Sequence, residues 1–302
     1  MNDNEAGLVR LEHRLVSSNG IRLHVVDAGP SDGEPVLLLH GFPDFWWGWR
    51  RVFGSLAAAG RRVIVPDMRG NGRSEAPRGS ASYALDILAD DIFGLIDELG
   101  INRCCLVGHD WGGVVAWSVA ARRPQSIAKL IAVAAPHPDT LLSGIRRDPV
   151  QLVRSLYIGL FQLPLLPEIA LSMRRFALLR RALANSSVPG TFSATDLEHY
   201  CETWRGLGRI RAMLGSYRAL SVPRAPVGRI AVPTQILWAG RDRFLGGALG
   251  RLALERCDDA RLTVLRDATH WVPHEHSQDI VAAVLSEGGE RRSPSSYGPG
   301  AR

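Results

Sequence analysis

Several features that would assign the chain to a specialised class are absent. Its four cysteines include no pair at C-x-x-C spacing, so neither a zinc site nor a disulfide framework is expected. No run of 18 apolar residues occurs, which argues against a membrane span. The net charge is +6, but no block of five like charges occurs, so nucleic acid is not an expected partner. The polar N-terminus lacks the apolar stretch of a signal peptide, and we expect a cytoplasmic protein.

The sequence does contain a regular alternation of strand-like and helix-like segments. A helix-like segment at 82–100 has apolar residues at three- and four-residue spacing. The later strand-like runs are continuous and rich in β-branched residues, which is typical of strands buried on both faces. This alternation predicts an α/β fold with a mostly parallel sheet and helices on both faces. The strand-like runs are 21–29, 35–41, 62–67, 103–109, 127–136, 234–240 and 261–267.

The alternation stops between about 140 and 226, where the chain is helical in character and rich in Leu and Arg. We expect 140–226 to form a helical cap, inserted between two parts of the core at 1–139 and 227–287. Open α/β sheets bind ligands outside the carboxyl ends of their strands, so such a cap would cover the site. Its many leucines suggest an apolar tunnel and a lipophilic substrate. The tail 288–302 is rich in Gly, Pro, Ser and Arg and is expected to be disordered.

The stretch "GHDWGG" at 108–113 has the pattern of a nucleophile elbow, a small-x-residue-x-small turn between a strand and a helix. Its central residue is Asp110, where Ser or Cys is more familiar. A carboxylate is already anionic at neutral pH, and its attack on a saturated carbon gives an alkyl ester that activated water can cleave. A serine would form an ether, which resists that second step. The alternative is that Asp110 is only a helix N-cap.

Such chemistry also needs a base and a group that orients it. His270 follows the last strand-like run, and Asp242 follows the preceding one, so the chain order is nucleophile, acid, base. His274 and His276 are alternative bases, and Asp139 is the alternative acid.

Hydrolysis of an ester passes through a tetrahedral anion, which requires hydrogen-bond donors. The turn "HGFP" comes directly after a buried strand-like run. We expect the backbone N–H groups of Phe42 and Trp111 to form this oxyanion hole.

Together "HGFPDFWWGWR", "DMRGNGRS", "GHDWGG", "GRDRFL" and "ATHW" resemble the epoxide hydrolases of the α/β-hydrolase fold, with haloalkane and haloacetate dehalogenases as relatives. The resemblance covers roughly residues 20–285 and keeps the motifs in order. It implies two ring-opening tyrosines in the cap, Tyr157 before Phe161-Gln162 and Tyr217 before Arg218. It also implies a small lipophilic substrate and no cofactor or metal. Each tyrosine could instead be a packing residue.

The same motifs leave alternative functions open. Haloacetate dehalogenases follow the nucleophile with Arg, and haloalkane dehalogenases usually have Asn where this chain has Phe42; here Trp111 follows Asp110. The indole N–H of Trp111 could still bind halide, so a haloalkane-type dehalogenase is the first alternative. A non-catalytic ligand-binding relative is the second. The sequence does not decide the oligomeric state, and a homodimer stays open.

Overall fold

The computed structural model describes residues 10–286, except for the side chain of Leu207. Eight strands form one sheet in the order β1-β2-β4-β3-β5-β6-β7-β8. The β1–β2 and β2–β4 pairs are antiparallel, and the remaining pairs are parallel, which confirms the predicted mostly parallel sheet. The strands are β1 (Leu11–Ser18), β2 (Ile21–Ala28), β3 (Pro35–Leu39), β4 (Arg62–Pro66), β5 (Cys104–His109), β6 (Ile127–Val133), β7 (Thr234–Ala239) and β8 (Ala260–Leu265).

Two edge strands differ from the sequence prediction. Strand β1 was not predicted, because only Val16 and Ser18 of its eight side chains are buried and no apolar run marks it. Strand β8 was expected to be buried on both faces, which is wrong. It pairs only with β7, and Val264 in its interior is 52% exposed.

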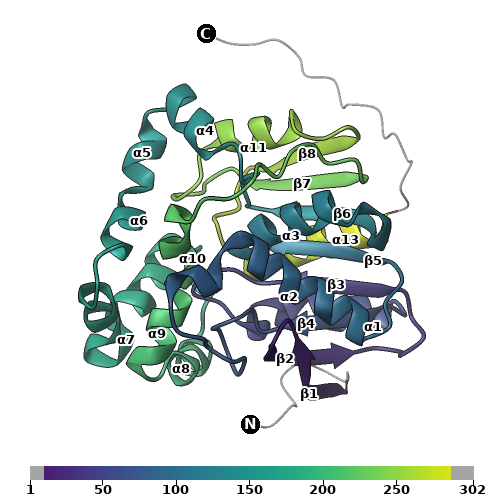
Figure 1. Cartoon of the computed structure of the whole chain (residues 1–302), viewed down its shortest axis with the longest axis horizontal. Helices are drawn as coiled ribbons and strands as arrows, with labels where there is room; N and C mark the ends of the chain where they lie inside the picture. The colour runs from purple at the N-terminus through teal and green to yellow at the C-terminus, as the bar shows by residue number, and fades with distance from the viewer. Residues whose placement is uncertain (1–9, 287–302) are drawn as a thin grey trace.

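Helices cover both faces of the sheet, as predicted (Figure 1). On one face α1 (Arg50–Ala58) packs against α13 (Ser277–Leu285), and on the other α2 (Leu85–Glu98) packs against α3 (Trp111–Arg122). Helix α2 is shorter than the predicted 82–100, because a separate 3-10 turn, η3 (Ser80–Tyr83), precedes it. Near the β8 edge, α11 (Gly247–Leu254) contacts β7 and β8. The remaining short elements outside the long insertion are η2 (Trp46–Trp49), η4 (Pro124–Ser126) and α12 (Val272–Glu275).

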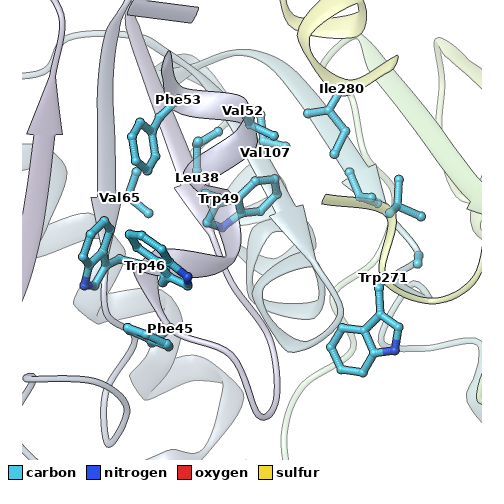
Figure 2. Packing of buried hydrophobic residues seen from close by; sticks show 14 of the residues in the cluster. Leu38, Phe45, Trp46, Trp49, Val52, Phe53, Val65, Val107, Trp271 and Ile280 are labelled. Carbon is cyan, nitrogen blue, oxygen red and sulfur yellow. The ribbon is translucent and has the colours of Figure 1, made fainter. Parts of the chain in front are cut away.

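The side chains of each central strand divide between two hydrophobic cores. Leu38 of β3 joins the core under α1, with Trp49 and Phe53 (Figure 2). Its neighbours Leu37 and Leu39 join the core under α2 and α3. Because successive side chains of a strand point to opposite faces, a continuous apolar run fills both cores.

A long helical segment lies between β6 and β7, on one side of the sheet (Figure 1). Its ring contacts reach residues that follow the carboxyl ends of strands: Phe161 lies 5.7 Å from Phe42, which follows β3, and Tyr217 lies 5.1 Å from Trp111, which follows β5. The segment therefore covers the end of the sheet at which the carboxyl ends of the parallel strands lie. Its elements are α4 (Leu141–Arg147), α5 (Val150–Arg154), α6 (Leu156–Phe161), α7 (Leu166–Ser186), α8 (Ala194–Thr203), α9 (Leu207–Met213), α10 (Gly215–Arg218) and η5 (Ala219–Ser221).

In the part of the chain that the structure describes, no single helix has the length and hydropathy of a membrane span. The helices of Val150–Phe161 and Leu166–Ser186 meet these criteria only as a pair, which is bent by 95°. The predicted disordered tail, 288–302, lies outside the described residues.

Candidate active site

Asp110 stands on a strained turn between β5 and α3. Its backbone has φ 52° and ψ −123°, a conformation that a residue with a side chain rarely adopts. The neighbouring glycines allow this turn, because a Cβ at Gly112 would lie 2.2 Å from the Leu39 carbonyl oxygen, and one at Gly108 would lie 2.5 Å from that of Gly112. Asp110 occupies the N-cap position of α3, but its side chain makes no capping hydrogen bond there. The carboxylate is thus directed away from the helix that it begins.

The backbone after β3 holds one oxygen of this carboxylate. Phe42 N donates to Asp110 Oδ1 at 2.9 Å. Gly41 permits the approach, since a Cβ there would lie 2.3 Å from the same oxygen. The Phe42–Pro43 peptide bond is cis.

A histidine and a second carboxylate lie in line with Asp110. His270 Nε2 lies 3.4 Å from Asp110 Oδ2, and its Nδ1 lies 2.8 Å from Asp242 Oδ2. The other oxygen of Asp242 accepts hydrogen bonds from Phe244 N at 2.7 Å and Leu245 N at 3.0 Å. The turn after β7 therefore orients Asp242, and Asp242 in turn orients the imidazole.

The alternative acid and the two alternative bases interact with residues other than Asp110. Asp139 accepts hydrogen bonds from Arg224 at 2.8 Å and from Gly228 N at 3.0 Å. His274 lies 3.4 Å from Asp44, and His276 lies 3.1 Å from Asp279. The structure brings Asp242 and His270, rather than these residues, to Asp110.

The pKa values of Asp110 and His270 are shifted in opposite directions. Burial alone lowers the pKa of His270, but the negative charges of Asp242 and Asp110 prevail and raise it to about 10. Burial tends to raise the pKa of Asp110, yet the hydrogen bond and charge of His270 hold it below its ordinary value. At neutral pH the imidazolium thus lies between two carboxylates.

A buried histidine next to the nucleophile position was missed by the sequence analysis. His109 Nε2 lies 2.8 Å from the backbone oxygen of His270. Burial lowers the pKa of His109 to about 4, so the ring is neutral and donates this bond. The sequence signal was the histidine inside "GHDWGG", whose partner is 161 residues away.

Two tyrosines from the helical segment lie over the carboxylate. Tyr157 comes from α6 and Tyr217 from α10, and their ring centroids are 5.8 Å apart. Tyr217 also packs edge-on against Phe42 at 5.3 Å. Burial and the nearby negative charge of Asp110 raise the pKa of both phenols, so both keep their protons at neutral pH.

Arg218 links α10 to α6, the two helices that carry Tyr217 and Tyr157. Its guanidinium donates to the backbone oxygens of Phe161 at 2.9 Å and Leu163 at 2.8 Å, at the end of α6. It also makes a two-pronged ion pair with the buried Glu168, at 2.7 and 3.0 Å. Gln162 Nε2 donates to the backbone oxygen of Tyr217 at 2.9 Å, which is a second link between α6 and α10. The planar fork of arginine suits this set of acceptors, and lysine could not reproduce it.

We expect Arg218→Lys to lower turnover about tenfold to a hundredfold, because loosening α6 from α10 moves both tyrosine hydroxyls. Steady-state kinetics on the class of substrate that the motif resemblance implies would measure this. The matched control is Arg211→Lys, since Arg211 lies 3.6 Å from the same Glu168 but is half exposed. A loss in Arg211→Lys equal to that in Arg218→Lys would contradict the positioning role.

A pocket joins these groups. It encloses about 1000 Å³ including its open mouth, and Asp110, Tyr157 and Tyr217 line it. Apolar side chains form much of the remaining wall, namely Val114, Leu141, Ile158, Leu220, Val222 and Leu245. The expectation that the leucines of 140–226 line a tunnel is only partly correct, because many of them face solvent instead.

Known proteins resemble this chain over most of its length. The family model described as alpha/beta hydrolase fold matches residues 34–277. AB hydrolase superfamily protein YfhM of Bacillus subtilis (strain 168) is 41% identical over 275 residues, 90% of this chain and 96% of that protein. The protein is thus an α/β hydrolase.

Relatives whose names state an activity show which group of α/β hydrolases the chain resembles. Epoxide hydrolase 4 of Mus musculus is 34% identical over 277 residues, 89% of this chain and 77% of that protein. A Bacillus megaterium epoxide hydrolase, solved in complex with an inhibitor, superposes with a TM-score of 0.79 at 30% identity, covering 89% of this chain and 98% of that one. The chain belongs to the epoxide hydrolases of the α/β-hydrolase superfamily, which confirms the resemblance seen in the motifs.

Proposed function

We propose that the protein converts a lipophilic epoxide to a vicinal diol through a covalent ester on Asp110. The observation that carries this proposal is the pair of protonated tyrosines over a carboxylate that is itself paired with His270. A halide leaves as a stable anion, whereas an opening epoxide needs a proton donor at its oxygen. We propose that the helical segment is the cap that supplies these donors.

In the first step Asp110 attacks one ring carbon, and the carbon–oxygen bond of the epoxide breaks. Oδ1 is held by Phe42 N, which leaves Oδ2 as the attacking oxygen. Tyr157 and Tyr217 hydrogen-bond the epoxide oxygen, and one of them transfers its proton to the alkoxide as it forms. The product of this step is a hydroxyalkyl ester of Asp110 and a tyrosinate.

Ester formation removes the negative charge of Asp110, so the pKa of His270 falls and its imidazolium loses a proton to solvent. In the second step the neutral His270 takes a proton from water, and the resulting hydroxide adds to the ester carbonyl carbon. The Phe42 and Trp111 amides stabilise the oxyanion on Oδ1. The intermediate collapses, the diol oxygen leaves with the proton from His270, and the new carboxyl group returns its proton to the tyrosinate. His270 then regains its proton from solvent, which restores the starting site. One epoxide and one water give one diol, and no cofactor takes part.

The experiment that tests the proposal compares two substrates of similar size, styrene oxide and phenethyl bromide, with the purified protein. We expect styrene glycol from the epoxide and no bromide from the halide, each measured against the uncatalysed reaction. Bromide release without diol would mean that Trp111 serves a halide and would overturn the proposal. Tight binding of either compound without product would favour a non-catalytic ligand-binding role.

A further inference from the structure

The outer side of the helical segment carries an unusual concentration of exposed apolar residues. Of the sixteen large apolar side chains that are exposed in residues 10–286, twelve lie between Leu142 and Leu178. Large exposed apolar areas usually mark an interaction site. We call these twelve residues the apolar face: Leu142, Val150, Leu152, Val153, Leu156, Leu160, Leu163, Leu165, Leu166, Ile169, Met173 and Leu178.

Helix α6 shows how this face arises. Tyr157 and Ile158 line the pocket on its inner side. On its outer side Leu156 is 60% exposed and Leu160 is 62% exposed. A helix that is apolar on all sides needs a covering on both faces, and the protein covers only one of them.

The residues of the apolar face recur at helical spacing. Val153, Leu156 and Leu160 follow one another at three- and four-residue steps along α5 and α6, and Leu163 follows three residues later, just past the end of α6. Leu166, Ile169 and Met173 do the same along the first part of α7. These steps place the side chains in stripes along the helices rather than scattering them.

Exposed arginines flank the apolar face and also occur within it. Arg146 and Arg147 lie in α4, and the pairs 174–175 and 180–181 lie in α7; all six side chains are exposed. Over 141–186 the only carboxylates are Asp148 and Glu168, and Glu168 is buried and paired with Arg218. From outside this range, Glu255 pairs with Arg147 at 2.9 Å and Glu198 pairs with Arg175 at 2.7 Å. The arginines outnumber these exposed carboxylates and Asp148, so the surface is basic as well as apolar.

We propose that this face docks on an anionic lipid surface, lying in the interface without spanning it. Apolar side chains with arginines beside and among them match the acyl and headgroup layers of such a surface. A second copy of the chain fits less well, because an isologous contact would bring the arginines of two identical surfaces together with few carboxylates between them.

Residues of the same helical segment line the pocket and form the apolar face. Leu141 and Leu220 line the pocket, and Leu220 is 49% exposed. Leu142, which adjoins Leu141, is 72% exposed and belongs to the apolar face. Resting on the proposed function, this arrangement lets an epoxide dissolved in the lipid enter the pocket without crossing water.

The test is co-sedimentation of the full chain with vesicles of phosphatidylcholine, with and without phosphatidylglycerol. We expect binding to the anionic vesicles that weakens with added salt. The variants Leu156→Gln/Leu160→Gln and Arg180→Gln/Arg181→Gln should each bind at least about tenfold more weakly. The matched controls lie at the edges of the sheet: Leu15→Gln on β1, and Arg261→Gln/Arg266→Gln at β8, should bind like the unchanged protein.

Turnover of dissolved styrene oxide separates this inference from the proposed function. No variant in the test touches the site, so each should keep its rate within about twofold. Diol formation without any vesicle binding would overturn the docking surface alone, and vesicle binding without diol formation would overturn the proposed function alone. A dimer seen by light scattering that Leu156→Gln/Leu160→Gln dissociates, with no vesicle binding, would show that a second copy covers the face and would overturn the proposal.

Discussion

Replacing His270 by glutamine is expected to leave the protein covalently loaded with its substrate. Glutamine keeps much of the shape and polarity of the site but cannot take a proton from water, so the ester forms and persists. Turnover should fall about a thousandfold or more. The intact-protein mass should rise by one substrate after mixing with the epoxide.

Asp110→Ala is the paired control for this experiment. It removes the attacking oxygen, so we expect neither diol nor an increase in mass. An adduct that forms equally well on Asp110→Ala would contradict Asp110 as the nucleophile. Diol formation by His270→Gln at the unchanged rate would contradict the role of His270.

The pH dependence of the two steps follows from the charges around His270. Its pKa is raised to about 10 because the carboxylates of Asp242 and Asp110 outweigh burial. Ester formation neutralises Asp110, which removes one of these two charges and lowers the pKa of His270. A base acts only above its pKa, so ester hydrolysis should become faster as pH rises, whereas ester formation should change little across neutral pH. Single-turnover rapid quenching between about pH 6 and pH 9 would measure the two steps separately.

The double substitution Tyr157→Phe/Tyr217→Phe is expected to abolish epoxide opening. It removes both proton donors and keeps both rings, so packing against Phe42 and Phe161 should persist. The rate of ester formation should fall by about three to four orders of magnitude, and each single substitution should cost less. Mass measurement should then show no adduct even when His270→Gln is added.

Tyr83→Phe is the matched control for the tyrosine pair. Tyr83 also lines the pocket and is buried, but its hydroxyl donates to the backbone oxygen of Pro77 at 2.8 Å. Its loss should change turnover by less than about tenfold. Rapid ester formation by the double variant would show that Tyr157 and Tyr217 contribute only the packing of their rings, and would contradict their role as proton donors.

The convergence of Asp110, Asp242 and His270 was predictable because each follows a strand-like run. The carboxyl ends of parallel strands meet at one edge of a sheet, so residues just past several strands come together there. The same rule could not choose between Asp139 and Asp242, since Asp139 also follows a strand of that sheet. The hydrogen-bond partners in the folded structure distinguish the two residues. Arg224 and Gly228 N donate to Asp139, whereas Asp242 Oδ2 lies 2.8 Å from His270 Nδ1.

The sequence by itself determined the fold class and the order of the motifs, because each depends on local periodicity or on residue type, and its aspartate elbow is the basis of the proposed chemistry. The tertiary structure alone decided which groups meet. It made β1 and β8 edge strands, joined His109 to the backbone of His270, and turned Leu156 and Leu160 outward while Tyr157 faces the pocket. A helix that is apolar on all sides looks the same in sequence whichever face is buried. Which face is covered depends on distant segments, and these meet only when the chain folds.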